Sequence, residues 1–204
     1  AADNCLTPTL TSTHNSGDTF IIGTTAVTYT ATDDATNTTT CSFNVTVSDT
    51  QAPTIACAGD ITQDAGANCD AVVTWSAPTV TENCTGETVV STHDSGDTFP
   101  MGTTEVGYTV TDAAGNVGTC TFNVIIEDNT VPTIDCPEAQ VLTADENCDG
   151  YMIDLVAMAT ATDNCAGSLT VTQDVAAGAS FTGGTVLLTA TDAANNSATC
   201  TVAV

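Results

Sequence analysis

The 204-residue chain contains no Lys or Arg, 25 acidic residues, 2 His and 10 Cys, and its formal net charge is −25. A chain without basic side chains has no surface that could hold nucleic acid or an anionic membrane, so both kinds of partner are excluded. No apolar stretch has the length needed to span a bilayer, so membrane insertion is not expected.

One strand–turn–strand phrase occurs three times, at residues 23–45, 102–124 and 183–204. In the middle copy, Thr104, Val106, Tyr108 and Val110 alternate with other residues, which is typical of a half-buried strand. The segment Thr111–Asn116 then supplies the small residues, Gly and Asn of a tight turn, and a second alternating run follows. The sequence therefore predicts a repeat array built on β-hairpins.

Two further phrases mark the ends of the repeats. An acidic residue followed by Asn-Cys ends at Cys5, Cys84 and Cys165, and linkers that carry Pro53 and Pro132 precede the first strand of a repeat. Proline has no amide donor and fixes the backbone, which suits the start of an edge strand.

These phrases predict a partial domain followed by two complete ones, at residues 1–50, 51–127 and 128–204. The partial domain lacks the first two strands, and the simplest account is a window cut from a longer array. A complete domain has about seven short strands separated by turn signals, which predicts a small antiparallel β-sandwich.

The cysteines recur at the same places in each repeat, which indicates disulfides and an oxidising compartment. Zinc ligation is disfavoured because no CxxC-type spacing occurs. Spacing alone does not rank the three pairings that the four cysteines of a complete domain allow. The partial domain holds only Cys5 and Cys41, which must pair if no link to another chain exists. Repetition then predicts the pairs Cys84–Cys120, Cys165–Cys200, Cys57–Cys69 and Cys136–Cys148.

The phrases PTIxC, (D/E)NC, STHxSGDTFPxGTT, TDAAGN and DxxxPT follow one another in a fixed order, and the last repeat lacks STHxSGDTF. This order resembles the hyalin repeat, or HYR, domain over essentially the whole chain. The resemblance implies an all-β fold of tandem immunoglobulin-like antiparallel β-sandwiches, about 80 residues each and disulfide-stapled, without enzymatic activity.

The resemblance also implies an adhesive or structural role outside the cell. We therefore expect a rigid rod or filament at the surface of a cell, with a bacterium as the expected source. The expected partners are other copies of the chain or neighbouring repeats of a fibre. Two alternatives stay open: a module that binds a surface glycan or a protein through the loops of residues 171–182, and a non-catalytic spacer of a larger secreted protein.

Carboxylates gather where the Asn-Cys phrase, the hairpin turn and the linker are expected to meet. Several oxygens without a cationic neighbour suit Ca²⁺, which accepts irregular geometry, and bacterial immunoglobulin-like adhesins with similar TDxAGN phrases stiffen their chains with such ions. The alternative is that these residues only cap turns. The predicted Ca²⁺ ligands are Asp3, Asp33 and Asp49 in the first unit, Glu82, Asp112, Glu127 and Asp128 in the second, and Asp163 and Asp192 in the third, with Asn37, Asn116 and Asn195 as possible carbonyl donors.

His14, His93 and Trp75 are each interpreted as structural rather than functional residues. His14 and His93 occupy matching places, but Gln173 stands there in the last repeat and no nucleophile has a base partner, so catalysis is not expected. Trp75 is interpreted as a core residue on a strand, with a sugar-stacking role as the alternative.

Overall fold

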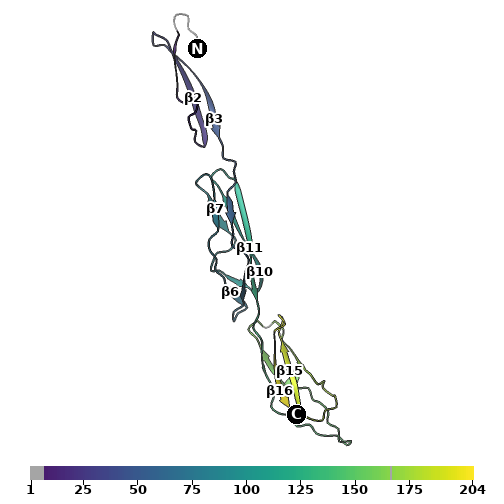
Figure 1. Cartoon of the computed structure of the whole chain (residues 1–204). Coiled ribbons are helices and arrows are strands. Elements are labelled where there is room, and N and C mark those ends of the chain that lie inside the picture. The colour runs from purple at the N-terminus through teal and green to yellow at the C-terminus, as the bar shows by residue number, and fades with distance from the viewer. Residues whose placement is uncertain (1–6, 166) are drawn as a thin grey trace. The chain divides into compact units, whose positions relative to one another are not determined.

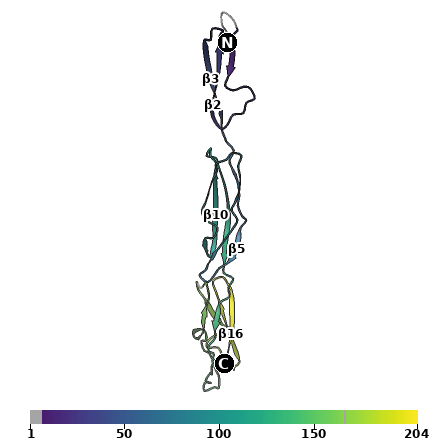
Figure 2. The ribbon, with the colours of Figure 1, turned by 90° about the vertical axis from the view of Figure 1, so that its left-hand side faces the viewer.

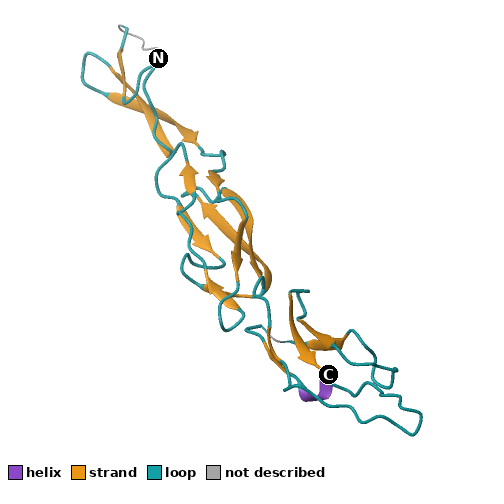
Figure 3. Ribbon diagram, turned by 60° about the horizontal axis from the view of Figure 1, so that its bottom comes forward, coloured by secondary structure: helices purple, strands orange, loops and turns teal. Residues whose placement is uncertain are grey.

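The computed structural model describes residues 7–165 and 167–204, and these form strands, turns and one short 3₁₀ helix, η1 (Val156–Met158, purple in Figure 3). Within these residues no helix has the length and apolar character required to cross a membrane. The chain divides into two compact units, Ala1–Ile55 with Val80–Val90 and Thr109–Thr119, and Ala56–Thr79 with Ser91–Tyr108 and Cys120–Val204.

The first repeat is an antiparallel sheet in the order β1-β2-β3, with β1 at Thr9–Ser12, β2 at Gly23–Thr32 and β3 at Thr38–Val47 (Figure 1). Val27 and Ala31 are buried on β2, because the alternation of this strand turns them to one face. Phe43 on β3 remains 53% exposed. The first repeat therefore buries few large side chains.

The middle repeat is the predicted sandwich. A four-stranded sheet has the order β5-β11-β10-β8, and two-stranded ribbons pair β4 with β7 and β6 with β9 (Figure 2). β5 runs parallel to β11, which is an exception to the antiparallel rule. The bounds of the strands are β4 Thr54–Ala56, β5 Ile61–Asp64, β6 Asp70–Val72, β7 Thr79–Thr81, β8 Thr88–Ser91, β9 Thr98–Pro100, β10 Gly102–Thr111 and β11 Val117–Glu127.

The core of the middle repeat lies between β10 and β11 on one side and the β6–β9 ribbon on the other. Val106 comes from β10, and Phe122, Val124 and Ile126 alternate along β11, as a strand with one buried face requires. Phe99 on β9 is 1% exposed and packs in the same cluster. The alternation in the sequence thus predicted this core face correctly.

The last repeat has the same hairpin, and its described residues form fewer strands around it than those of the middle repeat. Its strands are β12 (Thr133–Asp135), β13 (Thr160–Thr162), β14 (Thr170–Gln173), β15 (Thr185–Thr191) and β16 (Ser197–Ala203). They form a β14-β15-β16 sheet and a β12–β13 ribbon. The core cluster consists of Met152, Leu155, Val186, Leu188 and Val202.

All three predicted hairpins are confirmed, and each turns between an Asp and an Asn. In the middle repeat, the Asp112 amide donates to the Asn116 carbonyl at 3.0 Å. The residue before that Asn has a left-handed backbone in each hairpin: φ is 67° at Thr36, 92° at Gly115 and 74° at Asn195. Glycine and Asn accept this conformation readily, whereas a β-branched residue does so at a cost.

Thr36→Gly is therefore expected to stabilise the first repeat. Removing the Cβ from a left-handed position should raise the free energy of unfolding by about 0.5–1 kcal/mol, after the extra entropy of glycine in the unfolded chain is subtracted. Chemical denaturation measures this change. Thr38→Gly, at the start of β3, is the matched control and should destabilise the chain; stabilisation by both variants would contradict the explanation.

The structure corrects the predicted disulfide pairing. Cys57, directly after β4, bonds to Cys120 on β11, and Cys136, directly after β12, bonds to Cys200 on β16, with Cα–Cα distances of 5.8 and 6.0 Å. Each bond joins the first strand of a repeat to the last. The predicted pairs Cys84–Cys120, Cys165–Cys200, Cys57–Cys69 and Cys136–Cys148 are wrong, because the first strand of a repeat lies beside its last strand and brings their cysteines together. Cys41 is exposed and occupies the place of Cys120, while Cys5 lies outside the described residues.

Trp75 packs against the core, as predicted, but follows β6 rather than lying on a strand. Its ring meets Phe122 edge-on at a centroid distance of 5.3 Å. The indole Nε1 donates to the Tyr108 hydroxyl at 2.7 Å, which satisfies its one polar atom. These contacts favour the structural role over sugar stacking.

Candidate functional site

Three aspartates from separate segments meet in the last repeat. Asp128 follows β11, Asp163 follows β13, and Asp192 begins the β15–β16 turn. One carboxylate oxygen from each lies within 4.8 Å of the others. Asp128 and Asp192 are only 8% and 6% exposed. Burial of like charges at this distance is costly unless protons or a cation neutralise them.

Backbone amides position these carboxylates and leave part of their bonding capacity unused. The Thr130 amide donates to Asp128 Oδ1 at 3.1 Å, and the Cys165 amide donates to Asp163 Oδ2 at 2.9 Å. The other oxygen of Asp163, Oδ1, is buried and has no hydrogen-bond partner. An acceptor that is buried without a partner is costly, and a bound cation would relieve that cost.

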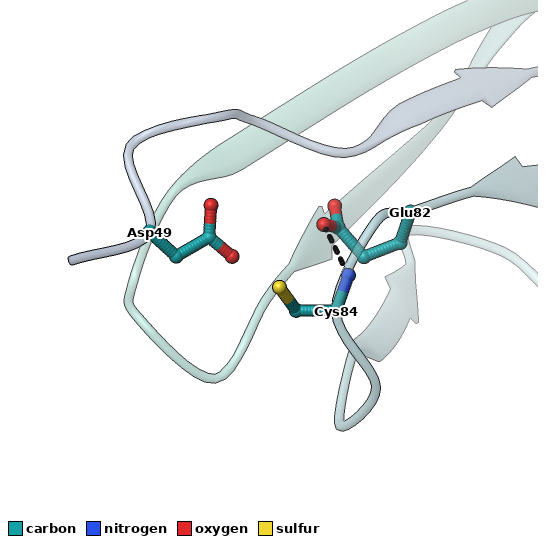
Figure 4. Close-up of side chains that lie close together, drawn as sticks. All are labelled: Asp49, Glu82 and Cys84. Atoms are coloured by element: carbon teal, nitrogen blue, oxygen red, sulfur yellow. Dashed lines mark hydrogen bonds between the residues drawn. The ribbon is translucent and has the colours of Figure 1, made fainter. Parts of the chain in front are cut away.

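The same arrangement occurs at the start of the middle repeat, where Asp49, Glu82 and Cys84 come together (Figure 4). Glu82 Oε1 accepts the amides of Asn83 and Cys84 at 2.8 and 3.1 Å, while Glu82 Oε2 is buried without a partner. The hydrogen bond to Asp49, followed by burial and the nearby carboxylates, raises the pKa of the Cys84 thiol above its usual value. This shift favours the protonated thiol, which is a poor metal ligand.

Each turn aspartate caps its own turn, and Asp192 is also a member of its acidic cluster, whereas Asp112 is not. Burial alone would raise the pKa of Asp112, but hydrogen bonds from the Asn116 side chain and from nearby amides outweigh it and lower the pKa. Asn116 Nδ2 also donates to the Asp49 carbonyl at 3.4 Å, and Asn196 Nδ2 donates to the Asp128 carbonyl at 2.9 Å. These side chains thus act as donors that connect the turn to the linker.

The structure brings together only part of the predicted ligand set, and the set itself stays a prediction. Asn196, rather than Asn195, corresponds to Asn116. Asp33 is engaged by the side chain and amide of Asn37, which lower its pKa, and it joins neither cluster. Glu127 is exposed and outside the clusters, and Asp3 lies outside the described residues.

The structure groups the candidate ligands differently from the three units of the sequence. Each linker aspartate joins the acidic residue of the following Asn-Cys phrase, so that Asp49 meets Glu82 and Asp128 meets Asp163. Sequence reasoning missed Cys84 as a member of the first cluster. Its place two residues after Glu82 was the available signal.

The two histidines make local contacts. His93 Nδ1 lies 3.2 Å from the Thr92 hydroxyl, and its ring packs 5.3 Å from that of Phe99. The carboxylate of Asp97 accepts the Asp94 amide at 2.8 Å. His14 stacks on Phe20 at a ring-centroid distance of 5.0 Å. Each histidine therefore lies beside a capped turn, with its ring packed against a phenylalanine.

Comparison with known proteins identifies the family. The family model of the HYR domain matches residues 1–47, 48–126 and 127–204. The chain belongs to the HYR domain family. Together with the strands and the two disulfides, this confirms the predicted fold class of tandem, disulfide-stapled, all-β repeats.

Relatives of this HYR chain include two hyalins. Hyalin of Strongylocentrotus purpuratus is 34% identical over 188 residues, which are 88% of this chain and 16% of that protein. Hyalin of Lytechinus variegatus is 38% identical over 144 residues, which are 67% of this chain and 27% of that protein. The sushi, von Willebrand factor type A, EGF and pentraxin domain-containing protein 1 of Rattus norvegicus is 37% identical over 109 residues, which are 53% of this chain and 3% of that protein.

The chain thus spans less than a third of each of these relatives. All three come from animals, so they give no support to the bacterial source that we expected from the sequence.

Proposed function

We propose that this chain is a stretch of an extracellular repeat protein with an adhesive or structural, non-catalytic role, and that Ca²⁺ bound beside the linkers stiffens it into a rod. Membership of the HYR family and the two disulfides support the extracellular setting. The expected partners are other copies of the chain or neighbouring repeats. Contact with surface glycans stays a prediction.

The observation that carries the proposed Ca²⁺ is the cluster of Asp128, Asp163 and Asp192. Two of its carboxylates are more than nine-tenths buried, and the chain contains no Lys or Arg that could neutralise them. Carboxylate oxygens from three segments are the ligands that Ca²⁺ prefers. The unpartnered Oδ1 of Asp163 supports the same assignment. An ion held by residues before and after a linker would restrict the motion of that linker.

Millimolar Ca²⁺ is expected to raise the thermal unfolding midpoint of the oxidised chain relative to excess chelator. An ion at 100 times its Kd stabilises the folded state by about 2.7 kcal/mol, which corresponds to roughly 5–10 °C for a chain of this size. Asp163→Asn should remove most of this rise. Differential scanning calorimetry measures the midpoint, and isothermal titration calorimetry of the unmutated chain measures binding directly.

Glu138→Gln is the matched control, because Glu138 is exposed in the same repeat and its substitution removes the same charge as Asp163→Asn. It should leave the Ca²⁺-dependent rise intact. A chain that shows neither heat of binding nor a shift would contradict the proposed metal and leave the aspartates as turn caps. Equal losses in Asp163→Asn and Glu138→Gln would indicate a general charge effect instead of a site.

A further inference from the structure

Two cysteines that belong to different repeats meet within one compact unit. Cys69 lies in the turn between β5 and β6 of the middle repeat, and Cys165 lies after β13 of the last repeat. Neither sulfur is bonded in the structure. The observed disulfides, Cys57–Cys120 and Cys136–Cys200, leave both residues without an assigned role.

Asn164 connects the two cysteines. The Cys69 thiol donates to the Asn164 carbonyl at 3.3 Å, although 95 residues separate them in sequence. Asn164 Nδ2 donates to the Gly66 carbonyl at 3.1 Å and lies 3.4 Å from Cys165 Sγ. Both sulfurs therefore lie beside the same residue, Asn164.

The burial of Cys165 and the packing of Cys69 against the same core favour a stable disulfide between these sulfurs. Cys165 is 6% exposed and belongs to the hydrophobic core cluster of the middle repeat, against which Cys69 packs. A residue of the last repeat thus contributes to the core of its neighbour. Cys69 is the more accessible of the two, so an external oxidant reaches it first.

The backbone holds the Cys69 thiol in place. Cys69 has a left-handed φ of 59°, in a turn closed by the Gly66 amide donating to the Asp70 carbonyl at 2.7 Å. A non-glycine residue pays for this conformation, and Gly or Asn would suit the turn better. Cys148 repeats the feature with φ 64° and the matching Asp145-to-Asp149 bond at 2.8 Å. The turn alone therefore does not explain the choice of cysteine.

We propose that Cys69 and Cys165 form a disulfide that joins the middle repeat to the last one. The Cys69 thiolate attacks a small-molecule disulfide, such as oxidised glutathione, and releases one thiol. Cys165 then displaces the second thiol as the protein S–S bond forms. Two protein thiols lose two protons and two electrons, and one oxidant disulfide becomes two thiols. Cys84 occupies the place of Cys165, and Cys148 occupies the place of Cys69. The same rule would therefore pair each of them with a cysteine of another repeat.

The test is a disulfide map of the unmutated full chain, oxidised with a glutathione redox mixture in the presence of chelator. The absence of Lys and Arg leaves trypsin no site, but cleavage before Asp places each of the 10 cysteines on its own peptide. Unpaired thiols are alkylated first, and the non-reduced peptides are analysed by mass spectrometry. The expected result is peptide 64–69 linked to peptide 163–173, besides the two links of the structure.

Cys69→Ser should abolish this linked peptide, make Cys165 alkylatable and lower the unfolding midpoint by about 10–20 °C, since a loop of this length is no longer closed. Cys148→Ser, which changes the same kind of turn, is the control and should leave the link intact. Alkylation of both Cys69 and Cys165 in the oxidised chain would overturn the proposal, as would a bond from Cys69 to any other cysteine.

The proposed Ca²⁺ binding does not enter this test, because the map is made in chelator. A missing link would leave the calorimetric Ca²⁺ response untouched, and a missing Ca²⁺ response would leave the linked peptide in place. The two proposals therefore fail separately.

Discussion

Cys57→Ala is expected to lower the free energy of unfolding by about 4 kcal/mol, because the bond to Cys120 closes a loop of 63 residues and restricts the unfolded chain. Cys120→Ala should cost about the same as Cys57→Ala, and the double variant should cost little more than either single one, since one bond is lost in all three. Denaturation of the oxidised variants by guanidinium chloride measures these free energies.

Cys84→Ala is the matched control for this prediction. Cys84 is half-buried and contacts Asp49 rather than another sulfur, so its replacement should cost clearly less. If Cys84→Ala and Cys120→Ala were equally destabilising and Cys57→Ala were mild, Cys84 would be the partner of Cys120. That result would reject the first-strand-to-last-strand pairing.

Phe99→Ala is expected to destabilise the chain by about 3–5 kcal/mol, because a fully buried ring is lost and a cavity remains. Phe99 is 1% exposed, with Trp75 at a centroid distance of 5.9 Å and His93 at 5.3 Å. Few other large side chains can move into the space, since aromatic residues make up only 4% of the chain. Chemical denaturation measures the loss.

Phe43→Ala provides the comparison. Phe43 occupies on β3 the place of Phe122 on β11 but is 53% exposed, so its removal should cost far less than that of Phe99. Equal losses from the two variants would mean that the first repeat contains a core as well formed as that of the middle repeat, against the exposure of its β3.

The hairpins could be predicted from the sequence because each depends on local information. Alternation of Val106 and Val110 with polar residues defines a face, and the Asp–Asn turn defines where the strand reverses. The three-residue strands β6, β7 and β9 were not predictable individually. Such short segments carry too little periodicity, and pairing with a distant strand decides their conformation.

The disulfide pairing and the membership of the acidic clusters could not be predicted from local sequence. That Cys57 faces Cys120 follows from the way the first and last strands of a repeat lie across the sandwich, which spacing does not encode. The same holds for Asp128, whose neighbours Asp163 and Asp192 come from segments far along the chain. The residue types were recognisable as candidate ligands, but the tertiary fold alone decides which of them meet.

The disulfide between the first and last strands of a repeat has a mechanical consequence. A pulling force that enters at Cys57 reaches Cys120 directly through the sulfurs, and the 63-residue separation between them cannot be drawn out even if the sandwich melts. About 200 Å of contour length is thereby withheld in each such repeat. Cys136 and Cys200 do the same over 64 residues. Under tension, the complete repeats would behave as short links of nearly fixed length, and any extension would come from the few residues outside the loops.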